Sequence, residues 1–147
     1  MQYNQSEFLI ETVVPEGELI ISRTDLNGNI TYANDTFCAI SGYEKDEIIS
    51  KPHNIVRHPD MPSEVFKDLW ETINKKGQWV GVVKNLRKDK GFYWVKAIIS
   101  GVYKDGELVE YKSLRAPIEH DQKLKYQKLY DDLRLKNGES VRTITYQ

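Results

Sequence analysis

Residues 79–118 read WVGVVKNLRKDKGFYWVKAIISGVYKDGELVEYKSLRAPI, and this stretch decides the fold. It contains three runs rich in β-branched and aromatic residues, separated by the short segments Lys88–Gly91 and Lys104–Gly106. Such runs are typical of β-strands, and short turns containing Asp and Gly join neighbouring strands in antiparallel order. The sequence therefore predicts a three-stranded antiparallel meander.

Two more strands are predicted upstream, in ELIISRTDLNGNITYAN at residues 18–34. Their two β-branched runs flank Asp25–Asn29, where Asn27 and Gly28 supply the positive φ of a hairpin turn. The following segment, NDTFCAISGY at residues 34–43, has the pattern of a short helix that ends at Gly42. We expect an antiparallel pair, then this helix, then another helical turn over residues 43–49.

Two longer helices are predicted. One starts after Pro62 and ends before Gly77, with one face buried. The second covers residues 121–136 and carries a broad apolar stripe of Leu124, Tyr126, Leu129, Tyr130 and Leu133. The element order indicates an α+β domain: a five-stranded antiparallel sheet with short helices on one face and an additional C-terminal helix. We divide the chain into an N-terminal cap segment (1–17), a central domain (18–117) and a C-terminal helix and tail (118–147).

Composition restricts the class of protein. The 147 residues are 39% hydrophobic, which suits one compact domain, and the net charge of -1 provides no field to attract nucleic acid or an anionic membrane. The single cysteine, Cys38, excludes an intrachain disulfide framework. No stretch approaches the roughly 20 apolar residues of a membrane span. We expect a soluble, cytoplasmic protein with no nucleic-acid partner and no direct membrane span.

The segment KPHNIVRHPDMP, residues 51–62, contains the main cluster of chemically versatile side chains. Pro59 prevents the regular helix that would place His53 and His58 together, so metal ligation is disfavoured. No serine elbow, P-loop or G-x-G-x-x-G turn accompanies the cluster, so catalysis is disfavoured too. Two interpretations stay open. In the first interpretation, Arg57 and Asp60 form a salt bridge in a structural loop and His58 caps a helix. In the second, the loop closes over a cofactor.

The chain resembles a PAS sensor domain. The resemblance is carried by TDLNGNITYANDTFCAISGYEKDEIISKPHNIVRHPDMP, by LWETINKKGQWVGVVKNLRKDKGFYWV and by the final strand, and it covers residues 18–117. Within this superfamily, HNIVRHPDMP is similar to the matching segment of bacterial aerotaxis receptors. That resemblance implies a PAS fold, FAD held without a covalent bond, and conversion of the flavin redox state into a chemotaxis signal.

The same resemblance implies roles for individual residues. Arg57, His58, Asp60 and Trp70 match positions implicated in FAD binding. In similar flavin-binding domains, the residue at the Asn85 position contacts the ring edge, the residue at Trp79 packs against the cofactor, and a small polar residue at Ser22 lies near the redox-active nitrogen.

Residue chemistry gives independent support for a flavin slot. The amides of Asn34 and Asn85 donate and accept, which matches a ring edge with carbonyl oxygens and an N–H. Strand alternation favours Asn85 inside and Lys84 outside. Asn34 equally suits the N-cap of the helix that follows, and Trp70 equally suits the core. The expected apolar lining is Ile20, Ile21, Ile30, Val82, Ile98 and Leu114.

Two expectations concern the strand residues around the first turn of the meander. Lys84–Lys90 is expected to be a solvated hairpin. Tyr93 and Trp94 are adjacent and point to opposite strand faces, so only one of them is expected to face the interior.

The functional prediction is a flavin redox sensor that performs no turnover and signals to a chemoreceptor-type partner through its last helix. A haem-binding PAS gas sensor, with His53 or His58 as axial ligand, and a small flavin oxidoreductase are the alternatives. A PAS–PAS homodimer is a further expectation. The output belongs either to a longer form of the same protein or to a separate receptor, which would make the chain membrane-associated only through that receptor.

Overall fold

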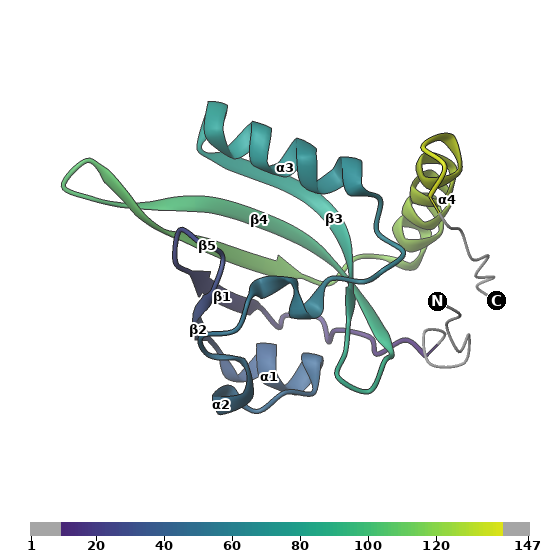
Figure 1. Cartoon of the computed structure of the whole chain (residues 1–147). Helices are drawn as coiled ribbons and strands as arrows, with labels where there is room; N and C mark the ends of the chain where they lie inside the picture. Colours follow the sequence, from purple (N-terminus) through teal and green to yellow (C-terminus); the bar gives the residue numbers. More distant parts are fainter. Residues whose placement is uncertain (1–9, 140–147) are drawn as a thin grey trace.

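The computed structural model describes residues 10–139, and its centre is a five-stranded antiparallel sheet (Figure 1). The strand order is β2-β1-β5-β4-β3. The first hairpin and the meander join because β1 pairs with β5. The predicted fold class is confirmed, with strands β1 Ile20–Thr24, β2 Ile30–Ala33, β3 Gln78–Leu86, β4 Phe92–Lys104 and β5 Glu107–Ala116.

Short helical segments connect β2 to the longer helix. They are α1 Asp35–Ser41, α2 Lys45–Ile48 and the 3-10 helix η2 His53–Val56. Asn34 is the N-cap of α1, since its Oδ1 accepts the Phe37 backbone N–H at 3.0 Å. Gly42 ends α1 with φ 83, a left-handed conformation that glycine adopts at little cost. The predicted start and end of this helix are therefore confirmed.

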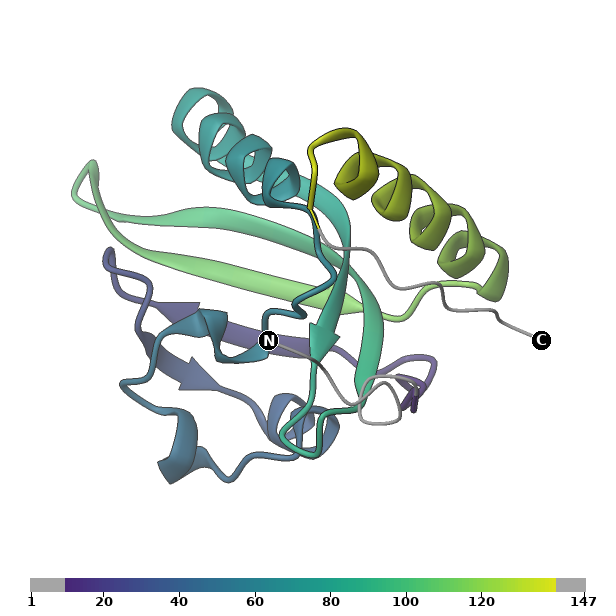
Figure 2. The ribbon, with the colours of Figure 1, turned by 45° about the vertical axis from the view of Figure 1, so that its right-hand side comes forward.

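The two longer helices are α3 Ser63–Lys76 and α4 His120–Lys136. Pro62 precedes α3 and Gly77 caps its end, as predicted. Figure 2 shows α4 lying across the sheet near β3, and the Tyr130 hydroxyl donates to the Val82 carbonyl on that strand. Within residues 10–139, no helix combines the length and apolar character needed to span a bilayer.

Helices cover both faces of the sheet at the β3–β4 end. On the face that α1 and α3 cover, the core includes Phe37, Leu69 and Val83. On the other side, the Trp94 ring stacks on Tyr130 of α4 with centroids 6.3 Å apart. Both Tyr93 (0% exposed) and Trp94 (2%) are buried. The expectation that only one of this pair faces the interior is wrong, because α4 covers the second face.

Lys84 is likewise not part of a solvated hairpin. It is 2% exposed, its Nζ donates to Gln127 Oε1 at 3.1 Å, and the same atom lies 4.4 Å from the centroid of the Phe92 ring. Only the tip of the turn, Lys88–Lys90, is exposed as expected. The difference arises because α4 lies over the Lys84 end of β3.

One face of α4 packs against the sheet domain, and part of its apolar stripe stays outside that contact. Leu124 (41% exposed) and Leu129 (44%) point largely to solvent, whereas Tyr126 and Leu133 are partly buried. The predicted apolar stripe is therefore only partly buried, because polar groups on the sheet and the preceding loop select which helix face docks. The buried residues of α4 are Lys123, Gln127, Tyr130 and Arg134.

The proposed division at residues 17 and 117 stays a prediction. The cap segment 1–17 and the tail 118–147 extend beyond the described residues, into 1–9 and 140–147. In the described part, the Thr12 backbone N–H donates to the Phe92 carbonyl at 2.8 Å, and Lys123 of α4 forms an ion pair with Glu11 at 2.7 Å. The N-terminal flanking segment therefore contacts both the sheet and α4.

Candidate functional site

A cavity of about 320 Å³ lies between the sheet, η2 and α3. Its size falls within the roughly 300–1,000 Å³ of small-molecule pockets. The apolar walls come from η2, α3, β3, β4 and β5, and the polar groups come mainly from β1, β3, β5 and η2. The apolar lining residues are Val56, Phe66, Leu69, Trp70, Val83, Ile99 and Tyr111.

Three polar side chains form a connected group on the cavity wall. Ser22 Oγ lies 3.1 Å from His53 Nε2, and Arg115 Nη1 lies 3.2 Å from the same nitrogen. A guanidinium can only donate, so His53 Nε2 accepts from Arg115 and the imidazole is neutral. The Phe37 ring meets the His53 ring edge-on with centroids 6.0 Å apart, which fixes the ring orientation.

The electrostatics of this wall are dominated by one buried cation. Burial, together with the smaller effect of the Arg115 charge, lowers the pKa of His53 to about 3. Burial also raises the pKa of the Tyr93 phenol to about 12. Within residues 10–139, no carboxylate contributes to the environment of Arg115, whose own pKa is lowered by burial. The wall therefore presents a positive charge beside neutral polar groups.

Buried polar atoms without a hydrogen-bond partner in the described chain converge on this cavity. They include Asn85 Nδ2, Ser113 Oγ and Arg115 Nε, and all three residues line it. Leaving such groups unpaired is costly, so they indicate a polar ligand. Two donors and a hydroxyl suit the carbonyl oxygens and ring nitrogens at a flavin edge. The residues present therefore fit a flavin.

The mouth of the cavity combines a cation with aromatic rings. The Arg57 guanidinium lies 3.8 Å from the centroid of the Phe66 ring, a cation–π contact. Trp70, 45% exposed, meets Tyr111 edge-on with centroids 5.3 Å apart. Exposed aromatic faces and a guanidinium suit the distal part of a nucleotide ligand, with stacking surfaces and a donor for phosphate.

The structure brings four of the eight predicted site residues to the cavity. Ser22 and Asn85 line its inner part, and Arg57 and Trp70 line its outer part. Arg57 also forms an isolated antiparallel bridge with Asn85, which places the loop against the edge of β3. Strand alternation predicted the inward orientation of Asn85, and the structure agrees.

The other four predicted site residues lie away from the cavity, two of them because other contacts use their polar atoms. Asn34 Oδ1 accepts the Ile21 and Phe37 backbone N–H groups, each at 3.0 Å, and its Nδ2 donates to the Leu19 carbonyl at 2.9 Å. Trp79 Nε1 donates to Asp68 Oδ2 at 2.9 Å. Asn34 is thus a helix cap and Trp79 is a core residue beneath α3.

His58 and Asp60 lie beyond the edge of β3, on the side of α4. The His58 ring packs edge-on against Phe92 at 6.1 Å, and its Nδ1 accepts the Asp60 backbone N–H at 3.0 Å. Asp60 Oδ1 lies 3.4 Å from Arg134 Nη1. The Arg57–Asp60 salt bridge considered from sequence is absent from the ion pairs of residues 10–139. Arg57 faces the cavity, whereas His58 and Asp60 lie on the opposite side of the β3 edge.

Sequence reasoning missed His53 as a wall residue, and it missed Ser113 and Arg115 entirely. Alternation along β5 could have grouped Ser113 with Arg115, but a charged residue on an inward face contradicts the expected pattern unless a ligand is present. His53 was considered only as a metal or haem ligand. Its contact with Ser22 joins residues far apart in the sequence.

The expected apolar lining is largely wrong. Ile98 pairs with Leu114, and Leu114 pairs with Ile21, so these three side chains form a row across the sheet. They have the opposite parity to Ser113 and Arg115 and point to the outer face. Ile20 and Ile30 are core residues with 0% exposure, and Val82 lies under α4.

We predict that His53 makes stability fall in mild acid. Its pKa is about 3 when folded, against an ordinary value of 6.5, so below pH 6.5 the unfolded chain binds a proton that the folded protein does not. The His53 contribution is complete above that value and decreases as the pH falls toward 3. From about pH 7 to about pH 5 the loss is about 1–2 kcal/mol.

Urea unfolding at a series of pH values measures this effect. His53→Gln should flatten the acid slope, whereas His120→Gln, which changes an exposed histidine at the start of α4, should keep it. Equal slopes for wild type and His53→Gln would contradict the assignment.

An antiparallel sheet with helices on its face and a cavity between them defines a small α+β domain. The family model described as PAS fold matches residues 30–115, more than half of the chain. The chain therefore belongs to the PAS family.

Two relatives of known name are similar in sequence to this chain. The chain is 44% identical over 104 residues to the aerotaxis receptor of Escherichia coli, covering 71% of this chain and 21% of the receptor. It is 32% identical over 111 residues to the nitrogen fixation regulatory protein of Klebsiella pneumoniae, covering 75% and 22%. The resemblance to aerotaxis-type PAS domains is confirmed. The chain spans about a fifth of the length of these relatives.

Solved structures confirm the fold. A PAS domain from Colwellia psychrerythraea superposes with a TM-score of 0.63 at 24% identity, covering 68% of this chain and 86% of that one. The light-state structure of the Aureochrome1 LOV blue-light photoreceptor gives a TM-score of 0.66 at 21% identity, covering 75% and 90%.

Proposed function

We propose that this chain is a flavin-binding PAS redox sensor that holds FAD in the described cavity. The observation that carries the proposal is the convergence of buried, partnerless polar atoms of Asn85, Ser113 and Arg115 on one cavity. Two similarities support a flavin as the ligand class. One is to a protein named aerotaxis receptor, and the other is to a solved light-oxygen-voltage domain whose mechanism was probed with a flavin analogue (TM-score 0.67, 18% identity).

The residues divide between the two ends of the ligand. Asn85, Ser113 and Arg115 would hydrogen-bond the ring edge, and His53, which also contacts Ser22, would hold Arg115 in place. Arg57 and Trp70 hold the outer, phosphate-bearing part. When bound, a flavin supplies an electron-accepting ring whose edge changes charge and hydrogen-bonding capacity on reduction. Arg115 provides a fixed positive charge next to that edge.

The geometry favours flavin over haem. His53 is the histidine at the cavity, and its Nε2 is already within hydrogen-bond distance of Ser22 and Arg115, so iron ligation would require the loss of these contacts. His58 is 0% exposed and lies beyond β3, away from the cavity.

The proposal extends to a non-enzymatic signalling role. The relatives' names describe a receptor and a regulator, which supports signalling to a chemoreceptor-type partner over turnover of a substrate. We propose a cytoplasmic location, with membrane association only through that partner. We also propose a PAS–PAS homodimer, which size-exclusion chromatography with light scattering would detect.

The test is one absorption spectrum of the purified protein. The visible bands of oxidised flavin are expected, with FAD released on denaturation and the bands bleached by dithionite. A Soret band would establish the haem alternative instead. A colourless protein that stays colourless after addition of FAD would overturn the proposal. Steady oxidation of a nicotinamide donor by the loaded protein would identify a flavin oxidoreductase.

We predict that alanine substitutions of Arg57 and His58 have different effects on FAD affinity and on thermal stability. Arg57→Ala removes a charged donor at the mouth and should weaken FAD binding about tenfold, the value of one charged hydrogen bond. His58→Ala removes a buried ring outside the cavity and should lower the melting temperature while leaving FAD affinity of the folded protein within about threefold.

Fluorescence titration with FAD measures both affinities. The control is Arg23→Ala, which removes an exposed arginine on the outer face of β1. If His58→Ala loses as much FAD affinity as Arg57→Ala, the placement of His58 outside the ligand site is contradicted.

A further inference from the structure

One wall of the cavity carries a tryptophan that is open to solvent. Trp70 lines the cavity from α3, and 45% of its surface is exposed. Its ring meets the Tyr111 ring edge-on with centroids 5.3 Å apart, and Tyr111 lines the cavity as well. A half-exposed indole adds less to the core than a buried one, so packing alone does not account for a tryptophan at this position.

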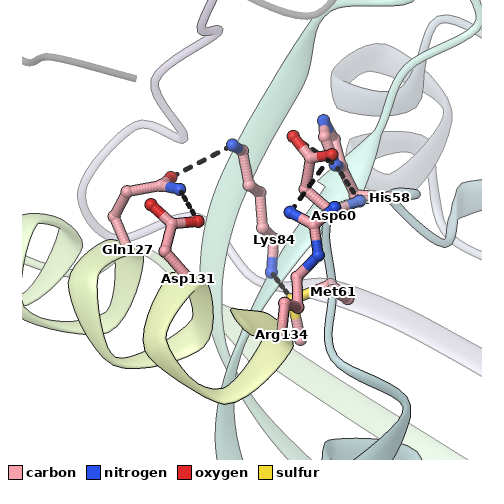
Figure 3. Close-up of polar contacts among 7 residues, drawn as sticks. All are labelled: His58, Asp60, Met61, Lys84, Gln127, Asp131 and Arg134. Carbon is pink, nitrogen blue, oxygen red and sulfur yellow. Dashed lines mark hydrogen bonds and ion pairs between the residues drawn. The ribbon is translucent and has the colours of Figure 1, made fainter. Parts of the chain in front are cut away.

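The other two tryptophans of the chain lie away from the cavity. Trp79 is a core residue beneath α3. Trp94 faces α4 on the opposite side of the sheet. Helix α4 closes that side, where Lys84 Nζ of β3 donates to Gln127 Oε1 of the helix at 3.1 Å (Figure 3). Trp70 is therefore the tryptophan that a ring bound in the cavity can contact.

Trp70 is also the lining residue best suited to give up an electron. Indole and phenol are the aromatic side chains that oxidise, and a phenol does so readily only if its proton leaves with the electron. Tyr93 is 0% exposed and burial raises its pKa to about 12, so its proton is held. The same requirement makes Tyr111 a poorer donor than the indole beside it. The exposed edge of Trp70 can release the indole N–H proton to water after the electron has left.

The charges of the cavity favour such an electron transfer. Arg115 is 5% exposed, and within residues 10–139 no carboxylate contributes to its environment. A ring that has taken an electron gains negative charge, which a preorganised cation in a site shielded from water stabilises. At the mouth, the Arg57 guanidinium disfavours a second positive charge and so promotes loss of the indole proton. The negative charge therefore forms beside Arg115, and the proton leaves at the open mouth.

From this arrangement we propose that Trp70 is a light-driven electron donor to the ligand of the cavity, so that blue light reduces the FAD-loaded protein when a thiol is present. This rests on the proposed function, because the ligand must be a flavin. On illumination one electron passes from the Trp70 indole to the flavin ring, and the indole loses its N–H proton to water. A thiol then returns one electron and one proton to the indole, and two of the resulting thiyl radicals pair as a disulfide. The single cysteine, Cys38, is not among the lining residues, so this thiol comes from solution.

The test is illumination of the FAD-loaded protein, freed of unbound FAD, with blue light in oxygen-free buffer that contains dithiothreitol. Loss of the oxidised flavin bands gives the rate of photoreduction. Trp70→Phe keeps an aromatic ring but raises the barrier to electron loss, and it should slow photoreduction about tenfold or more. Trp70→Tyr should give an intermediate rate. The fluorescence of bound FAD should rise in Trp70→Phe, because the electron transfer competes with emission.

Three controls separate electron donation from a structural role of Trp70. Reduction by dithionite in the dark does not use the indole and should be alike in wild type and both Trp70 variants. Trp94→Phe changes the tryptophan on the α4 side, and Tyr103→Phe changes an exposed ring outside the cavity. Both should keep the wild-type rate of photoreduction.

The outcomes distinguish this proposal from the proposed function. All proteins are compared at full FAD loading, which their spectra confirm. Equal rates of photoreduction in wild type and Trp70→Phe would overturn electron donation by Trp70 and leave FAD binding intact. A wild-type protein that takes up no FAD would contradict the proposed function, and this inference would fail with it.

Discussion

Replacing Arg115 with methionine is expected to stabilise the ligand-free protein and to weaken FAD binding at least a hundredfold. Arg115 is 5% exposed, and within residues 10–139 no carboxylate offsets its charge. A buried cation without a counter-ion carries a large desolvation cost, so a methionine of similar length should raise the free energy of unfolding by about 1–2 kcal/mol.

The opposite effect on binding has the same cause. In the proposed complex, the guanidinium meets an electron-rich ring edge in a site shielded from water, where a charged hydrogen bond and its field together are worth about 3 kcal/mol. Removal of the charge forfeits that interaction. Stability is thus exchanged for function at this position, as is common at binding sites.

Urea unfolding of the ligand-free protein and fluorescence titration with FAD measure the two effects. The matched control is Arg23→Met, at an exposed position of the same sheet, which should change neither quantity appreciably. If Arg115→Met instead lowers the stability of the ligand-free protein, the contact between Arg115 and His53 stabilises the fold, and the prediction is wrong. If FAD affinity is unchanged, the ligand lies elsewhere.

Gly81→Ala is expected to destabilise the protein by about 2–3 kcal/mol, although alanine ordinarily improves a strand. A Cβ at Gly81 would lie 2.2 Å from Cη2 and 2.3 Å from Cζ2 of Trp79. Trp79 is 5% exposed and its Nε1 is bonded to Asp68 of α3, so the ring cannot move without losing that bond or shifting α3.

Thermal unfolding followed by circular dichroism should show a melting temperature about 5–10 °C lower for Gly81→Ala. Gly101→Ala is the matched control, because its Cβ would meet Leu108 Cδ1 at 2.6 Å, the end of a flexible side chain that can turn away. A melting temperature for Gly81→Ala equal to that of Gly101→Ala would show that the Trp79 ring is loosely held.

The sequence by itself determined the elements and the family. Period-two runs set the strands, Asn34 and Gly42 set the ends of α1, and Pro62 and Gly77 set those of α3, because these signals act between residues close together in the chain. The segment 53–62 indicated the aerotaxis-type PAS resemblance, which the comparisons confirm.

Alternation also predicted the correct face for Asn85, since Lys84 and Asn85 must point to opposite sides of β3. It did not predict that both sides are covered. Tyr93 is buried on the cavity face, and Lys84 and Trp94 are buried as well because α4, about forty residues further along the chain, lies over the second face.

Only the tertiary structure decided which members of the 51–62 cluster reach the ligand cavity. His53 and Arg57 do, while His58 and Asp60 pass the edge of β3 and face α4. It likewise decided that Arg115 faces the cavity and that α4 docks through Lys123, Gln127, Tyr130 and Arg134. A long polar side chain has no preferred side until a partner is placed against it, because its cost of burial depends on contacts made by residues distant in sequence.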